Sequence, residues 1–168
     1  MLSSLLLLQQ PAEQPPRAGA PGRGIDQLAF LVGGTWVAHP IPTATVTEVC
    51  KWAPGNLAIV TKGEQEIGGH VTSAYGVFWY DPEEDALRSN SVSSTGDVQS
   101  AEEVDRLSHG HTWAFDSYVH GDSGARHLLV TIKQLGPDEF TLTSAPLAEE
   151  GGPPGVAVTV AYHREGGV

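Results

Sequence analysis

Short runs of β-branched and aromatic residues, separated by turn-forming residues every 8–12 positions, fill the chain from Ile25 onward. This spacing is typical of antiparallel sandwiches and barrels. The expected strands are Thr35–His39, Ala44–Trp52, Leu57–Glu66, Ser73–Tyr80, Ala86–Ser93, Val98–Asp105, Thr112–Val119, His127–Leu135, Glu139–Ser144 and Val156–Arg164. Roughly ten strands with no helical repeat predict an all-β fold, an antiparallel up-and-down barrel, because closure removes the exposed edges of an open sheet.

One short helix is expected before the first strand, over Ile25–Val32, because Gly33 and Gly34 end the segment after barely two turns. Its apolar side chains would form a plug against one end of the barrel. These side chains are Leu28, Phe30, Leu31 and Val32.

Apolar and polar residues alternate in most of the predicted strands, which indicates one dry face and one wet face. In the last strand Val158, Val160 and Tyr162 share one face. The segment from Leu87 to Thr95 differs, because small polar residues occupy both of its faces. Buried hydroxyls and amides need hydrogen-bond partners, so this wall predicts a wet or ligand-filled interior. The alternative is a strand that faces water on both sides.

Charge and cysteine content exclude several classes of function. The 168 residues suit one domain, and their net charge is −11 with only nine Lys and Arg. With no basic stripe, the chain is not expected to bind nucleic acid or an anionic membrane surface. The single cysteine, Cys50, precludes an intrachain disulfide and is expected to be a small buried residue on a strand.

The first 24 residues differ in composition from the rest of the chain. An apolar run from Leu5 to Leu8 precedes a segment rich in Pro, Ala and Gly. The run is too short to insert into a membrane and span it, and it lacks the basic start of a secretion signal. Residues 1–24 are thus expected to be a disordered tail or a signal-peptide remnant, and residues 25–168 the barrel domain. The remnant is favoured and implies a periplasmic or secreted location, with a cytoplasmic one left open.

The segment Phe30-Leu31-Val32-Gly33-Gly34-Thr35-Trp36 resembles the opening of bacterial lipocalin-like proteins of unknown function, with one extra residue before the tryptophan. The glycine of Tyr75-Gly76-Val77-Phe78, the Tyr80-Asp81-Pro82 turn and the Ser/Gly-rich region from Ser89 to Ser100 add to the resemblance. It implies a calycin-type barrel with an internal cavity, distantly similar to nitrobindins and fatty-acid-binding proteins, and an exported protein.

Two departures limit what the resemblance implies. Trp36 is not followed by the glycine-rich opening of nitrobindins, and Tyr162-His163-Arg164 reverses the order of the Arg-x-Tyr pair of fatty-acid-binding proteins. Neither a haem site nor a fatty-acid clamp is therefore carried over.

Histidines are the candidate metal ligands. His109 and His111 would share one face of an extended segment, but a metal site needs further ligands from separate segments such as those of His39, His120, His127 or His163. His163 on the last strand is the position for an axial haem ligand. Surface histidines are the commoner explanation, so no metal and no cofactor is predicted.

The leading hypothesis is a barrel that binds a small, mostly apolar molecule in its interior, as a monomer or homodimer. Aromatic walls with a few hydroxyls suit such a pocket. The residues predicted to bind the ligand are Tyr75, Trp79, Ser91, Ser93, Trp113, Phe115 and Tyr162. Two alternatives stay open. One is an enzyme (an isomerase, cyclase or hydrolase) that uses an inward-facing carboxylate or a histidine among His70, His111, His127 and His163. The other is a solid barrel that meets a protein partner.

Overall fold

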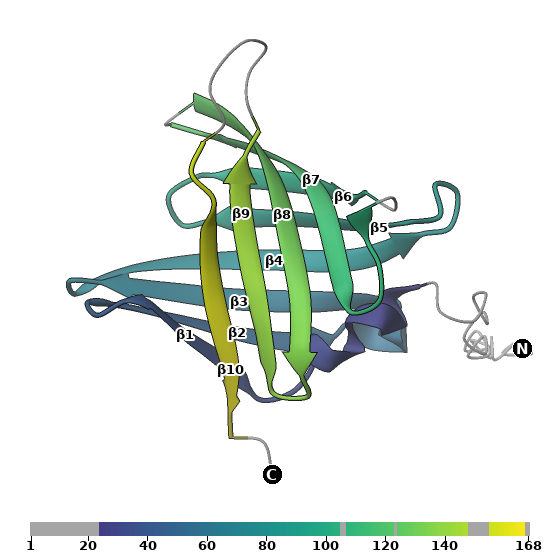
Figure 1. Ribbon diagram of the computed structural model, residues 1–168, viewed down its shortest axis with the longest axis horizontal. Helices are drawn as coiled ribbons and strands as arrows, with labels where there is room; N and C mark the ends of the chain where they lie inside the picture. Colours follow the sequence, from purple (N-terminus) through teal and green to yellow (C-terminus); the bar gives the residue numbers. More distant parts are fainter. Residues whose placement is uncertain (1–23, 105–106, 123, 148–154, 167–168) are drawn as a thin grey trace, which may run out of the picture.

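A computed structural model describes residues 24–104, 107–122, 124–147 and 155–166. Its ten strands form one closed antiparallel barrel, which confirms the predicted fold class (Figure 1). The strands are β1 (Thr35–Ile41), β2 (Ala44–Trp52), β3 (Ala58–Ile67), β4 (His70–Asp81), β5 (Ala86–Ser93), β6 (Val98–Glu103), β7 (Thr112–Gly121), β8 (Gly124–Gly136), β9 (Glu139–Pro146) and β10 (Val158–Glu165).

Each strand pairs with the next in the chain, and β1 pairs with β10 to close the barrel. The closing register sets Trp36 opposite Arg164. Directly opposed residues lie on the same face of a sheet, so this register fixes which side chains on the two strands turn inward. β2 and β5 have the predicted bounds, whereas β4 and β8 run several residues further into their hairpins.

The expected N-terminal helix is a 3₁₀-helix, η1 (Ile25–Leu31), seen in purple at one end of the barrel in Figure 1. Short helical segments commonly take this tighter form. Leu28 and Leu31 are buried against the barrel, as the plug prediction requires. The Trp36 indole donates a hydrogen bond to the Leu31 carbonyl at 2.7 Å, which fixes the helix to the start of β1. We call this covered end the base and the opposite end the open end. Within the described part of the chain, no helix is long and apolar enough to cross a bilayer.

Aromatic contacts fill the base. Phe140 packs edge-on against Trp36, with ring centroids 4.8 Å apart, and stacks on Tyr162 at 4.6 Å. Phe30 of η1 stacks on Trp113 of β7 at 5.3 Å. These pairs join the helix to β7 and join β9 to β1 and β10, so aromatic side chains pack the base.

Arg164 links β10 to the helix and to β1. Its guanidinium lies over the Trp36 ring, 4.3 Å from the centroid, and donates to the backbone carbonyls of Phe30, Val32 and Gly33. The segment after η1 must pass close to this side chain. A Cβ at Gly34, which has φ of 70°, would lie 2.9 Å from Arg164 Cγ, so glycine is required there for space and for conformation.

Candidate functional site

The barrel interior changes from packed to accessible along its axis. At the base, inward side chains such as Leu87 and Phe115 are buried. Toward the open end, Ser144 on β9 keeps accessible surface, and Val158, its partner on β10, is 58% exposed. Both share the inner face with Tyr162, because alternate residues of a strand lie on one side. An inward side chain stays accessible only where neighbours do not fill the barrel, so the interior is unfilled near the open end.

Glu48 lies on the inner face of β2 and is only partly buried. Its cross-strand neighbours are Trp36 on β1 and Gly63 on β3, and Ala74 on β4 follows Gly63 in the same row. A Cβ placed on Gly63 would meet nothing nearer than the Thr47 carbonyl, at 3.8 Å. The small residues leave room beside the carboxyl, and the Glu48 side chain keeps accessible surface although the barrel wall encloses it.

Burial governs the electrostatics around Glu48. Loss of hydration raises the pKa of the Glu48 carboxyl above its usual value. Burial also raises the pKa of the Cys50 thiol and that of the Tyr162 phenol, and the negative charge of Glu48 adds to both shifts. The three side chains therefore lie within electrostatic reach of one another. We call Glu48, Cys50 and Tyr162 the Glu48 cluster.

The Glu48 carboxyl makes no hydrogen bond or ion pair with any residue in the described ranges. Buried carboxylates normally have such partners, because an unpaired charge in a low-dielectric site is strongly destabilising. An acidic group with space in front of it and no partner is a candidate for contact with a ligand.

Small polar side chains form one wall of the interior. Ser89, Ser91 and Ser93 on β5 turn inward and are half-buried, so the polar segment of the sequence does reach the interior. Ser93 bonds to the turn that follows it. On the neighbouring strands Gln99 donates to the buried Ser117 hydroxyl at 2.7 Å. Ser89 and Ser91 thus offer hydroxyls to whatever fills the cavity.

Five of the seven residues predicted to bind a ligand turn inward. Ser91 and Ser93 line the accessible half, and Tyr162 lies between that half and the base. Trp113 and Phe115 belong to the packed base, where the Trp113 indole donates to Gln27 of η1 at 3.2 Å. The role of these side chains in binding stays a prediction.

The other two predicted residues lie on the outer face of β4. Tyr75 is 56% exposed, and Trp79 is half-buried on the same side of the strand. Gly76 and Phe78 take the inner positions between them. Tyr75 and Trp79 therefore do not line the interior. The polar side chains that do face the interior include those of the Glu48 cluster.

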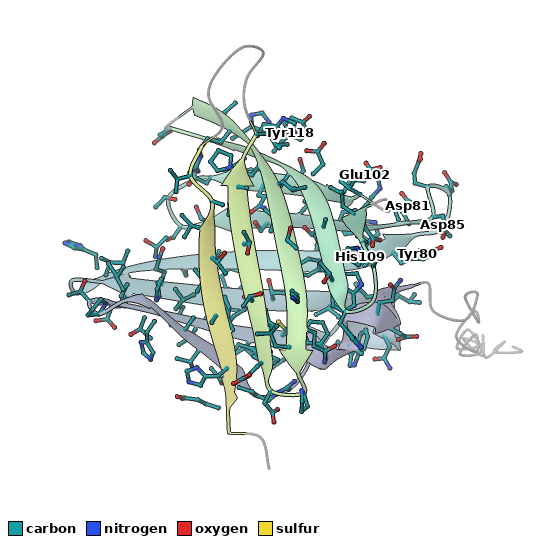
Figure 2. The ribbon with its side chains drawn as sticks, in the orientation of Figure 1. Tyr80, Asp81, Asp85, Glu102, His109 and Tyr118 are labelled. Atoms are coloured by element: carbon teal, nitrogen blue, oxygen red, sulfur yellow. The ribbon has the colours of Figure 1, made fainter. Side chains whose placement is uncertain are left out.

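Trp79 lies in a groove on the outside of the barrel. The groove has a volume of about 650 Å³, and its walls include Arg88, Glu102, Asp116 and Tyr118. Figure 2 shows Glu102 and Tyr118 on this side of the molecule. Arg88 lies 3.1 Å from Glu102 and also pairs with the nearby Asp81, so its charge is neutralised locally. The groove is therefore a polar surface with paired charges.

Of the four histidines considered as catalysts, only His70 has an inner-face position, and it is exposed at the first residue of β4, in the hairpin with β3. His163 points outward, 3.6 Å from Glu165, and His127 on the outer face bonds to Asp116. His70 and His111 are exposed at strand ends. An interior haem with His163 as axial ligand is therefore inconsistent with this barrel.

The histidine pair considered for metal binding lies before β7, with both His109 and His111 exposed. Over the described ranges, no three His, Cys, Asp or Glu side chains gather closely enough to hold a metal ion.

Sequence reasoning missed Glu48, although the sequence contains a signal for it. In the alternating strand Thr45 to Trp52, Glu48 has the same parity as Val46, Cys50 and Trp52. A charged residue in an otherwise apolar register marks an ionisable group directed at the core.

No protein-family model matches the chain, and the search of curated proteins finds no match. The ten-stranded closed barrel is consistent with the calycin-type architecture that the opening segment resembles.

Proposed function

We propose that the protein is a lipocalin-like carrier that binds a small, mostly apolar molecule inside its barrel. The observation that carries the proposal is the accessible surface of inward apolar side chains near the open end, above a base sealed by η1. Val160, Leu142 and Leu128 supply an apolar wall on β8–β10. Ser89 and Ser91 face the same space and can orient a polar end of the ligand.

Burial of the ligand would drive binding. Removing about 300 Å² of apolar surface from water yields about 7 kcal/mol at roughly 25 cal/mol per Å². Part of this gain is offset by lost translational and rotational freedom, and a micromolar affinity requires about 8 kcal/mol net, so burial of this area alone would give an affinity no tighter than about millimolar.

The proposal is tested with a fluorescent lipophilic probe and a pair of tryptophan variants on β4. Ala74→Trp places an indole in the interior beside Gly63, whereas Val71→Trp places one on the outer face, where Val71 is 62% exposed. We expect the probe to bind wild type and Val71→Trp equally and to lose at least tenfold in affinity for Ala74→Trp. Circular dichroism checks that both variants fold. Equal binding by both variants would show that the probe sits outside the barrel and would refute the proposal.

Glu48 also supports the enzyme alternative, because it is an inward carboxyl whose pKa is raised by burial. An enzyme would release altered molecules, whereas a carrier returns its ligand unchanged. Mass spectrometry of a ligand extracted after prolonged incubation separates the two functions, and a product that disappears in Glu48→Gln would favour catalysis.

The exported location and the monomeric or homodimeric state remain part of this proposal. Cell fractionation tests the first, and light scattering of the purified protein tests the second.

A further inference from the structure

We infer that the interior site selects amphiphilic molecules with a basic nitrogen, and that Glu48 is the counter-ion of the ligand's ammonium group. This inference rests on the proposed binding function and names the chemistry of its polar end.

The first support is the unsatisfied state of the Glu48 carboxyl. It turns into the barrel beside Gly63 and Ala74, keeps accessible surface, and has no hydrogen-bond or ion-pair partner among the described residues. A carboxyl held away from water gains most from a ligand that brings a positive charge or a hydrogen-bond donor. The Tyr162 hydroxyl, in the same cluster, can share in that contact.

The second support is the position of the basic residues in the described ranges, of which only Arg164 and Arg126 have inner-face positions, and both already have a carboxylate partner. Arg164, at the base, is occupied by Trp36, the η1 carbonyls and Asp138. Arg126 pairs with Asp97 at 3.6 Å near the open end. The other described basic residues lie on the outer face, and they are Lys51, Lys62, Arg88 and Lys133.

The third support is the overall charge. A net charge of −11 gives the molecule a negative potential, which attracts cationic molecules and repels fatty-acid anions. The Glu48 carboxyl and the overall negative charge of the protein thus both favour positively charged ligands.

Binding of an ammonium group would be coupled to release of the proton from the Glu48 carboxyl. If Glu48 is protonated in the empty barrel, the incoming ammonium displaces its proton to solvent, and the carboxylate and ammonium remain paired. The other ionisable or charged groups near Glu48 are Cys50 on β2 and Tyr162 and Arg164 on β10. The raised pKa values of Cys50 and Tyr162 keep both groups protonated from pH 4 to 8. Within the Glu48 cluster, amine affinity should therefore follow the ionisation of Glu48.

Three probes with the same ten-carbon chain test the inference by calorimetry: decylamine, decanol and decanoate. We expect wild type to bind decylamine at least tenfold more tightly than decanol, and decanoate most weakly. In Glu48→Gln the amine preference should disappear while decanol binding persists. The matched control is Glu64→Gln, which removes the same charge from the outer face of β3 and should keep the preference.

The outcomes distinguish this inference from the proposed function. If no probe binds, the carrier proposal fails, and the inference fails with it. If decanol and decylamine bind wild type equally, or Glu64→Gln abolishes the preference as fully as Glu48→Gln, the inference fails and the carrier proposal stands. A pH series on wild type needs no variant. Decylamine affinity should fall on acidification while decanol affinity stays constant, and a flat decylamine profile would overturn the inference.

Discussion

Replacing Arg164 with alanine should destabilise the barrel more than any single change on its outer surface. The side chain is 13% exposed, donates to four backbone carbonyls and lies over the Trp36 ring. Hydrogen bonds from a charged donor contribute about 1.5–3 kcal/mol each, and a cation–π contact about 1 kcal/mol. Because one guanidinium makes all of these contacts, they are not additive. We expect a net loss of about 3–5 kcal/mol in the free energy of unfolding.

The partner acid provides the matched control. Asp138 pairs with Arg164 at 3.1 Å, but its side chain is 67% exposed, so Asp138→Asn should lower the free energy of unfolding by no more than about 1 kcal/mol. Arg164→Lys keeps the charge but loses the planar fork, and it should recover only part of the loss.

Urea unfolding followed by far-ultraviolet circular dichroism measures all three variants. A loss below about 1 kcal/mol for Arg164→Ala, or equal losses for Arg164→Ala and Asp138→Asn, would refute the reasoning, because the carbonyl contacts would then contribute little.

Three further predictions concern the interior. The pKa of Glu48 is raised in the folded barrel, so the wild-type side chain contributes stability below its unfolded pKa, and this contribution is lost as the pH rises through the folded pKa. Compared with wild type, Glu48→Gln should therefore be more stable at neutral pH than at acid pH. Parallel curves of unfolding free energy against pH for the two proteins would contradict this. Gly76→Ala brings a Cβ within 2.7 Å of Thr61 Oγ1 and should lower the free energy of unfolding by about 1–3 kcal/mol. Gly63→Ala makes only an ordinary van der Waals contact, at 3.8 Å from the Thr47 carbonyl oxygen, and should not destabilise; equal midpoints of the two variants in urea would contradict this. Cys50 is buried with a raised pKa, so a thiol reagent should modify it only after unfolding, and rapid labelling of the native protein would show that the reagent reaches it.

The sequence predicts the strands well because their signals are local. The alternation of apolar and polar side chains, together with the flanking turn residues, predicts β2 and β5 at their observed bounds. The helix also ends before Gly33, as expected. The facing of β4 is harder, because aromatic residues occupy both of its sides. Phe78 pairs with Ile59 of the neighbouring strand β3, and Ile59 is buried inside the barrel. Phe78 therefore turns inward, and Trp79, the next residue, turns outward.

The candidate site depends on long-range pairing and so is less visible in the sequence. The parity of Glu48 in its strand predicts an inward carboxyl. Its lack of a partner depends on Gly63 and Ala74 lying beside it, and its closeness to Tyr162 depends on closure of the barrel. These contacts join distant segments, and no local pattern records them.

The pairing of β1 with β10 joins the first strand of the barrel to the last, so its formation orders the folding process. Hairpins such as β3–β4 can assemble early because their partners are neighbours in the chain, but the seam must wait for the whole meander. A sheet in which β1 and β10 were not yet paired would have two exposed edge strands, which favour self-association. Arg164 lies on this seam and donates to the carbonyls of Phe30 and Val32, so closure of the barrel and covering of its base by η1 depend on the same side chain.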